Sequence, residues 1–455
     1  MEMKNLVKVF ALILVICLTA GSFAGCQQDT GPDGSSSVAT TAPLEIVDYA
    51  ASIKLNLSSD TAKVENVSVK SFVDGDTTHF HVPTSVSSDG VLKVRYLAIN
   101  TPESTGKIEE WGKKASKFTK EKLSSATSIL IESETSSWNP DSTGSRYLAW
   151  VWYKTAEDEE YRNLNIEILQ NGLAIANSSA NNQYGSTCIN AINQAKAQKL
   201  NIYSGEKDPD FYYGEAVELD LKELRTNIDA YNGMKVAFNG VVTMNNDQTV
   251  YVEAYDAETD MYYGMAVYYG YNLTGGGLDV LTVGNEARIV GTVQYYETGG
   301  TWQVSGLSYS QMRPNDPDNI QKLSEGNDPA YVLTAPSTFV NGTVETEVSD
   351  ELKSFPYAQL AMSTSIEMKD LVVKSVYTTT NESSSSKGAM TLTCEADGVT
   401  VSIRTVVFLD ENGNLITADA YQGKTIDVKG VVDYFDGTYQ IKVFTPDNIT
   451  VHESN

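Results

Sequence analysis

Two strand-like runs in the first half of the chain end in residues that carry oxygen donors. Residues 64–73 alternate as a strand does and then break at the turn 74–77, which reads Asp-Gly-Asp-Thr. Residues 91–99 form a second such run, which stops before Pro102 because proline cannot donate to a ladder. Donors that are all oxygens suit a hard cation such as Ca²⁺ better than zinc, which prefers His and Cys. The donors available at these two strand ends are Asp76, Asn100, the Thr101 carbonyl and Glu103.

Two arginines accompany these oxygens. Arg95 lies five residues before Asn100, and Arg146 follows the loop 141–145 and opens the strand-like run 147–153. A divalent cation and guanidinium groups stabilise the charge that builds on phosphate oxygens, while Glu103 is placed to orient or deprotonate the attacking water. The set predicts phosphodiester hydrolysis.

Six segments carrying these residues resemble the thermonuclease (staphylococcal nuclease-like) family, in the same order along about 150 residues. A series of this kind is far more specific than any one of its motifs. The segments are residues 73–77 (VDGDT), 94–103 (VRYLAINTPE), 111–115 (WGKKA), 144–151 (GSRYLAWV), 165–174, and 194–203.

The resemblance implies a five-stranded OB-type barrel with helices at about 109–125, 163–171 and 187–200. It also implies cleavage of DNA or RNA with Ca²⁺ as cofactor. In the roles that it implies, Arg95 and Arg146 hold the phosphate and Glu103 is the base. Asp76, Asn100 and the Thr101 carbonyl bind calcium.

Three departures from the family pattern bear on activity. Asn100 stands where the family usually has an aspartate, which keeps an oxygen donor but removes a charge and so lowers the expected calcium affinity. The arginine loop carries the extra residue Ser145 and lacks a Tyr-Gly-Arg pattern. Residues 175–180 lack the tyrosines that stack on the nucleotide in the best-known member, and such stacking contributes about 1–3 kcal/mol per base.

His79 and His81 offer a competing constellation, because residues two apart in a strand share a face. Zinc needs more than two ligands and no other His or Cys is near in sequence, so the two are interpreted as strand surface residues. Cys188 and Cys394 lie in apolar patterns and are interpreted as core residues rather than as nucleophiles or ligands.

The N-terminus predicts export and a lipid anchor. Residues 9–20 form an apolar run too short to span a bilayer but long enough for the core of a signal peptide. It ends in Phe-Ala-Gly-Cys at 23–26, which resembles a bacterial lipobox, so Cys26 is expected to be acylated and to become the mature N-terminus. A plain signal peptide with an incidental cysteine is the alternative. The polar stretch that follows is typical of a tether.

The second half differs in charge and pattern. Of the net charge of -26, little lies in residues 61–210, which carry 16 Lys and Arg against 19 Asp and Glu, whereas residues 211–455 carry 14 against 34. Residues 284–296 recur about 139 residues later as 423–435, each followed by a glycine turn and a closing strand. The repeat predicts two OB-like antiparallel barrels. Their tyrosines favour binding of bases or sugars, whereas their acidity favours a role as spacer or protein-binding modules.

The whole chain is therefore expected to be mainly β with some α. Its predicted parts are a signal peptide (1–25), a tether (26–60), a thermonuclease-like domain (61–212) and two OB-like domains (213–320 and 321–455). The predicted function is that of a nuclease anchored at the extracellular face of a bacterial membrane. The alternative is a catalytically weak or inactive surface protein that binds nucleic acid, glycan or protein through its OB-like domains.

Overall fold

The computed structural model describes residues 45–271, 273–297, 299–313, 316–349, 351–381 and 384–452. The predicted signal peptide, the acylated Cys26 and most of the predicted tether lie outside the described residues. From Val47 onward the chain forms one compact unit. Among the helices of the described ranges, none is both long and apolar enough to cross a membrane.

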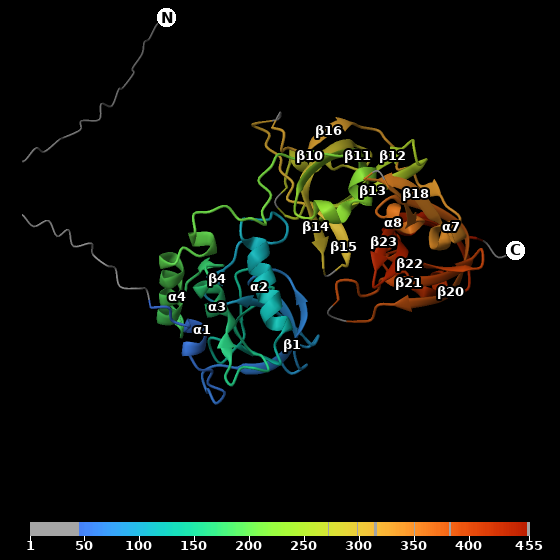
Figure 1. Cartoon of the computed structure of the whole chain (residues 1–455). Helices are drawn as coiled ribbons and strands as arrows, with labels where there is room; N and C mark the ends of the chain where they lie inside the picture. Colours follow the sequence, from blue (N-terminus) through green and yellow to red (C-terminus); the bar gives the residue numbers. More distant parts are fainter. Residues whose placement is uncertain are drawn as a thin grey trace, which may run out of the picture. The chain divides into compact units, whose positions relative to one another are not determined.

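Five strands close the first barrel (Figure 1). Neighbouring strands pair antiparallel, except that β3 and β7 close the barrel in parallel, with Val94 beside Tyr147. This order is that of an OB barrel, as the family resemblance implied. The strands are β1 (Val64–Phe72), β2 (Thr77–His81), β3 (Val91–Tyr96), β5 (Ser128–Glu132) and β7 (Tyr147–Lys154).

Three helices of seven or more residues accompany this barrel, close to the predicted ranges: α2 (Gly112–Ser124), α3 (Leu164–Gln170) and α4 (Gly185–Ala197). The first begins three residues later than expected because Trp111 has a left-handed backbone (φ 67°), which no helix accommodates. The second is capped by Asn163, whose side chain accepts from the Ile166 amide at 3.0 Å. Helices α3 and α4 pack against each other.

Strand β7 is buried on both faces, unlike a strand at the surface of a barrel. Trp150 and Trp152 are fully buried, and both rings meet Tyr184 at the start of α4, with centroids 5.0 and 5.7 Å away. Shorter elements complete this part of the chain. They are α1 (Tyr49–Ser52), β4 (Ile99–Asn100), β6 (Asn139–Pro140), β8 (Arg162–Asn163), β9 (Ile175–Ala176) and the 3-10 turn η1 (Asn201–Tyr203).

A second barrel follows with the same strand order. Its third and fifth strands pair in parallel at Val267 and Val304, and its first and fourth pair antiparallel. The strands are β11 (Lys235–Asn246), β12 (Thr249–Asp256), β13 (Met261–Tyr268), β14 (Glu286–Tyr296) and β15 (Thr301–Ser305). The additional elements are β10 (Val217–Glu218), α5 (Leu221–Thr226), η2 (Ile228–Tyr231), α6 (Gly276–Val280) and β16 (Gln321–Ser324).

The third barrel has the same strand order as the second. The internal sequence repeat therefore corresponds to two barrels of the same topology. Its strands are β20 (Ser365–Thr378), β21 (Met390–Ala396), β22 (Val399–Thr405), β23 (Thr425–Phe435) and β24 (Thr438–Val443). The additional elements are β17 (Val332–Leu333), α7 (Pro336–Asn341), β18 (Thr343–Val348), β19 (Glu351–Pro356), α8 (Tyr357–Leu360), η3 (Ala418–Ala420), η4 (Pro446–Asn448) and β25 (Ile449–Val451). The prediction of two OB-like barrels is confirmed at the level of the fold, whereas the domain boundaries stay predictions.

The apolar core falls into two clusters. One gathers buried residues between Ala50 and Ile192, and the other runs from Leu221 to Ile449 through both later barrels. Cys188 is fully buried in the first cluster and Cys394 in the second, and burial raises the pKa of each thiol to about 12. Both cysteines are core residues, as predicted.

Candidate active site

The turn between β1 and β2 is held tightly against its surroundings. The amides of Val73 and Asp74 both donate to the Thr77 carbonyl, at 3.1 and 3.3 Å, and the Gly75 carbonyl accepts from the Thr119 hydroxyl of α2 at 2.6 Å. A Cβ on Gly75 would lie 2.9 Å from Thr101 and from Ala115 in α2. Glycine is needed here because helix and turn approach so closely.

Asp76 ties this turn to the second predicted strand end. Its carboxylate is buried and accepts from the Thr101 amide at 2.8 Å and from the Thr77 hydroxyl at 3.2 Å. Its carbonyl accepts from the Tyr96 amide at 2.8 Å. The two strand ends that the sequence placed 25 residues apart therefore meet at this side chain.

Arg95 lies between two of the predicted calcium ligands. It projects from β3, opposite Thr77 of β2, and its guanidinium donates one hydrogen bond to the Asp76 carboxylate and another to the Asn100 side-chain oxygen. Two of the predicted calcium ligands are thus bonded to an arginine. A cation held by both would have to share them with Arg95 or displace it.

The acidity of Asp76 is unusual. Burial, followed by the nearby charge of Asp74, raises the pKa of Asp76 to about 7, against the opposing effect of Arg95. Asp74 is itself buried and accepts from the Asp76 amide at 3.1 Å. Two carboxylates with one guanidinium partner carry excess negative charge, which favours the approach of a cation.

Glu103 is held through its backbone by the loop before α2. The Glu109 amide donates to the Glu103 carbonyl at 2.9 Å, and the Glu109 carboxylate accepts from the Glu103 amide at 3.1 Å. A Cβ on Gly112 would collide with the Glu103 carbonyl, so only glycine lets the helix begin at this point. The exposed Glu103 side chain therefore projects from a fixed backbone.

The electrostatic surroundings of Glu103 include both predicted arginines. Partial desolvation of its carboxyl, the charge of Asp74 and that of Glu109 raise the pKa of Glu103, while Arg95 and Arg146 act in the opposite direction. A raised pKa brings a carboxylate closer to the range in which it accepts and returns protons near neutral pH. Asp74, Arg95, Glu103 and Arg146 are thus electrostatically coupled.

Arg146 is oriented by an aspartate in its own loop. Its Nε and one terminal nitrogen both contact the Asp141 Oδ2 at 2.7 Å, while the other Asp141 oxygen accepts from Thr143. Burial alone would raise the pKa of Asp141, but the hydrogen bonds from Thr143 and Arg146 outweigh it and the pKa is lowered. The ion pair leaves the remaining terminal nitrogen of Arg146 free of Asp141.

The donor set fits a hard cation. Asp76, Asn100 and Thr101 supply oxygens, and the buried acidic pair Asp74 and Asp76 exceeds its guanidinium partner in charge. Among the described residues, a group of three His, Cys, Asp or Glu side chains close enough to share an ion is found on the third barrel and not at this site. A cation in the first barrel would therefore depend on the Asn100 amide and a backbone carbonyl.

The histidines and the segment after α3 lie near this region but take no part in the cluster. His79 is in β2, and its Nδ1 lies 3.3 Å from the Ser71 hydroxyl oxygen, a hydrogen-bond distance. Burial, together with the charges of Lys93 and Lys70, lowers the pKa of His79. In β9, Ile175 pairs with Asn100, so the stretch without tyrosines runs beside a predicted calcium ligand.

Residues 93–205 match the protein-family model described as Staphylococcal nuclease homologue. The chain carries a domain of this family. The matched range of the nuclease-fold domain includes Arg95, Glu103 and Arg146, and the barrel begins before it with the strands that supply Asp76. A search of curated proteins finds no match to the chain.

Sequence reasoning did not assign roles to three residues of this nuclease-fold domain. Asp74 had a signal, since it shares the turn motif with Asp76, but its burial could not be seen. Asp141 was visible only as the first residue of the arginine loop. Glu109 stands at the start of the helix that the family resemblance implied at about 109–125, and nothing in the sequence indicated that it holds Glu103.

Proposed function

We propose that the nuclease-fold domain is a calcium-dependent phosphodiesterase that hydrolyses DNA or RNA. The observation that carries the proposal is that hydrogen bonds join Asp76, Arg95, Asn100 and Thr101 in one cluster. The pKa of Glu103 is affected by the charges of both Arg95 and Arg146. Carboxylate, guanidinium and oxygen donors are the groups that phosphodiester hydrolysis requires.

In the proposed reaction Glu103 accepts a proton from water as the water oxygen attacks phosphorus. Arg95 and Arg146 donate to the phosphoryl oxygens, on which charge builds as the water oxygen attacks. The P–O bond to the leaving oxygen then breaks, and that oxygen takes up a proton from solvent. The ion pair with Asp141 restricts the conformations of the Arg146 side chain, which reduces the conformational entropy lost when phosphate binds.

A calcium ion, when bound by Asp76, Asn100 and the Thr101 carbonyl, would supply positive charge to the phosphate and lower the pKa of a coordinated water. Because Arg95 hydrogen-bonds two of these ligands, its release toward phosphate and the binding of calcium are expected to occur together.

We further propose that the mature protein is exported and anchored through Cys26 at the outer face of the membrane. The lipobox-like residues 23–26 and the polar stretch after them support this location. Mass spectrometry of the mature N-terminus tests it. A diacylated Cys26 is expected, and an unmodified Cys26 in the mature protein would overturn the proposal.

The activity is tested by digesting single-stranded and duplex DNA, and RNA, with the purified mature chain over a range of calcium concentrations. Cleavage that requires calcium and stops with chelator is expected. Glu103→Gln should lower kcat by about 10² to 10⁴, the range for loss of a general base. Glu157→Gln, in an exposed loop, is the matched control and should cleave as the wild type does.

A second candidate function is nucleic-acid binding without efficient turnover. The engagement of Arg95 with Asn100 favours it, as does the absence of aromatic side chains in residues 175–180. Oligonucleotide binding measured by fluorescence anisotropy, without cleavage at any calcium concentration, would support this candidate and reject the enzyme.

A further inference from the structure

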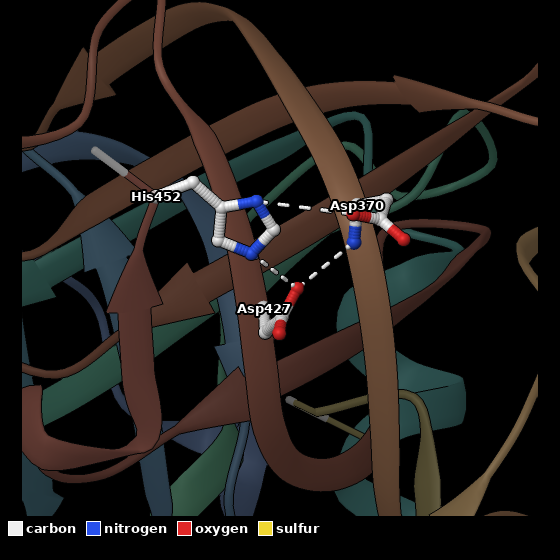
Figure 2. Close-up of side chains that lie close together, drawn as sticks. All are labelled: Asp370, Asp427 and His452. Atoms are coloured by element: carbon white, nitrogen blue, oxygen red, sulfur yellow. Dashed lines mark hydrogen bonds and ion pairs between the residues drawn. The ribbon is translucent and has the colours of Figure 1, made fainter. Parts of the chain in front are cut away.

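Asp370, Asp427 and His452 meet on the third barrel, far along the chain from the nuclease-fold domain (Figure 2). We propose that these three side chains form a site for a divalent transition-metal ion of the zinc or manganese type. The ligand atoms that they offer all lie within 4.8 Å of one another. The proposal concerns a barrel that takes no part in the proposed phosphodiester chemistry.

The pairing of β25 with β23 brings His452 to Asp427. Val451 pairs with Ile426, and the His452 amide donates to the Thr425 carbonyl at 2.9 Å. Residues two apart in a strand share a face, so His452, opposite Thr425, lies diagonally beside Asp427 on one face. The position of the imidazole is set by strand register rather than by a free tail.

Asp370 reaches the same place through an irregularity in β20. The register between β20 and β23 shifts between Met368 and Leu371, which leaves Lys369 and Asp370 outside the regular ladder. The Asp370 amide donates to the Asp427 Oδ1 at 2.9 Å. This bond holds Asp370 next to Asp427, and Figure 2 shows the Asp370 carboxylate beside Nδ1 of His452 and the Asp427 carboxylate beside Nε2.

The imidazole faces a carboxylate with each of its nitrogens. Nε2 lies 2.8 Å from the Asp427 Oδ1, a hydrogen-bond distance, and Nδ1 lies 3.8 Å from the Asp370 Oδ1. A neutral imidazole has one N–H and one lone pair. When Nε2–H donates to Asp427, the lone pair of Nδ1 points toward the negative Asp370, and a cation between them removes the repulsion.

The distances suit a metal ion better than a second hydrogen bond. An N–O separation of 3.8 Å is too long for a hydrogen bond but is bridged by an ion about 2.1 Å from each atom. The Asp427 carboxylate then has the position in which acidic groups commonly orient a metal-bound histidine. An imidazole nitrogen with carboxylate oxygens is a donor set that zinc and manganese accept.

The surroundings leave the negative charge of the two aspartates available. Lys369 and Lys429 pair with Glu367, at 3.5 and 4.0 Å, and Lys424 donates to the Ala420 carbonyl at 2.7 Å. The Asp370 side chain is 82% exposed, so an ion can enter directly and complete its coordination with water. The excess of acidic residues in the second half of the chain also raises the local concentration of cations.

The proposal is tested on the full mature chain with Zn²⁺ and with Mn²⁺, in calcium sufficient to saturate the nuclease-fold domain. Zn²⁺ binding is measured by titration calorimetry. Mn²⁺ is used to broaden the histidine ring signals in NMR spectra, which are simple because the chain has only three histidines. The signal of His452 is assigned as the one that His452→Gln removes, and it is expected to broaden at the lowest Mn²⁺ concentration.

Three variants separate ligand from support. His452→Gln and Asp370→Asn should each weaken Zn²⁺ binding by at least tenfold, and Asp427→Asn by about 10- to 100-fold, the usual effect of removing a group that orients a ligand. Asp397→Asn removes one exposed charge from a turn of the same barrel and is the matched control, expected to bind Zn²⁺ as the wild type does.

Circular dichroism before each titration shows whether a variant is folded, and the exposed Asp370 gives a variant in which folding is least affected. Zn²⁺ affinity that is the same in the wild type and in the Asp370 and His452 variants would overturn the proposal. So would histidine signals that Mn²⁺ leaves sharp, because the three residues would then form a hydrogen-bonded cluster only.

Discussion

Asn100 determines how many charges a cation would meet in the first barrel. Its side-chain oxygen is shared with Arg95, and Asp76 is the only charged member of the predicted calcium ligands. Calcium affinity in oxygen sites follows the number of charged ligands. We therefore expect the calcium affinity of this site to be low, and we expect an added charge at residue 100 to raise it.

Asn100→Asp should raise calcium affinity about tenfold because it adds a second charged ligand. Titration calorimetry with calcium measures the change. Asn177→Asp, an exposed position in the neighbouring segment, adds the same charge without adding a ligand and should change affinity much less. Equal affinity in wild type and Asn100→Asp would show that residue 100 does not bind the ion.

Asp141→Asn should lower kcat/KM for DNA about tenfold, since the amide nitrogen that replaces Oδ2 can no longer accept from Arg146. Steady-state kinetics with and without Arg146→Ala measure the effect. The two substitutions should be non-additive if Asp141 acts through Arg146. Additive losses would contradict a positioning role for Asp141.

At the scale of elements, the loop between β4 and α2 sets the position of Glu103. It closes on itself through Glu109 and lets α2 begin at Gly112, directly against the Glu103 carbonyl. Because the carboxylate projects from this backbone, a displacement of the loop moves the base while the barrel remains intact.

Gly112→Ala should therefore lower kcat by about 100-fold, the effect expected when a reacting group is displaced by about 1 Å. The added Cβ collides with the Glu103 carbonyl and pushes the loop away. Lys117→Ala, at an exposed position of the same helix, is the control and should leave kcat unchanged. Kinetics that are normal in Gly112→Ala would show that the loop yields without moving the carboxylate.

Strand β5 ends in a buried carboxylate with a consequence for stability. Glu132 accepts from the Trp152 indole at 2.9 Å and from the Tyr184 hydroxyl at 3.0 Å. Burial raises the pKa of Glu132, although these hydrogen bonds oppose the shift. The folded state thus binds the proton more tightly than the unfolded state, so this group contributes stability below about pH 4.3 that is lost as pH rises through its folded pKa.

Glu132→Gln should flatten this dependence, because glutamine keeps an oxygen acceptor and does not ionise. Urea unfolding at several pH values, starting at pH 4 and rising to neutrality, measures the free energy of unfolding of each form. The wild type is expected to lose more stability over this interval than the variant. An identical loss in both would assign the pH dependence to other groups.

At the scale of the molecule, two separate apolar cores imply two unfolding units. One core lies within residues 50–192, while the other continues through both later barrels. A shared core makes the two later barrels one cooperative unit, in contrast to the first barrel.

Calorimetry should show two thermal transitions, of which calcium raises only one. A ligand at 100 times its Kd stabilises the state that binds it by about 2.7 kcal/mol. Met368→Ala, in the later core, should destabilise the other transition by about 2–5 kcal/mol, and Ile168→Ala should affect the calcium-sensitive one. A single transition that responds to calcium and to both substitutions would contradict two units.

Much of the first barrel was predictable because its information is local. Strand alternation and Pro102 placed the first strands, and the family resemblance implied helices α2 to α4, in each case to within about three residues. The repeat at 284–296 and 423–435 likewise indicated two barrels of one kind, because equivalent strands carry similar residues. The start of α2 was misplaced, since the left-handed Trp111 depends on the loop that it closes.

The sequence by itself determined which residue types could hold a cation and a phosphate, and the nuclease resemblance that groups them. Only the tertiary structure decided which of these side chains contact one another. It showed that Arg95 bonds two predicted calcium ligands and that Asp141 holds Arg146. It also brought His452, a residue of the C-terminal tail in the sequence, to two aspartates. Such contacts depend on strand register and barrel closure, which join residues far apart in the chain and leave no local pattern to read.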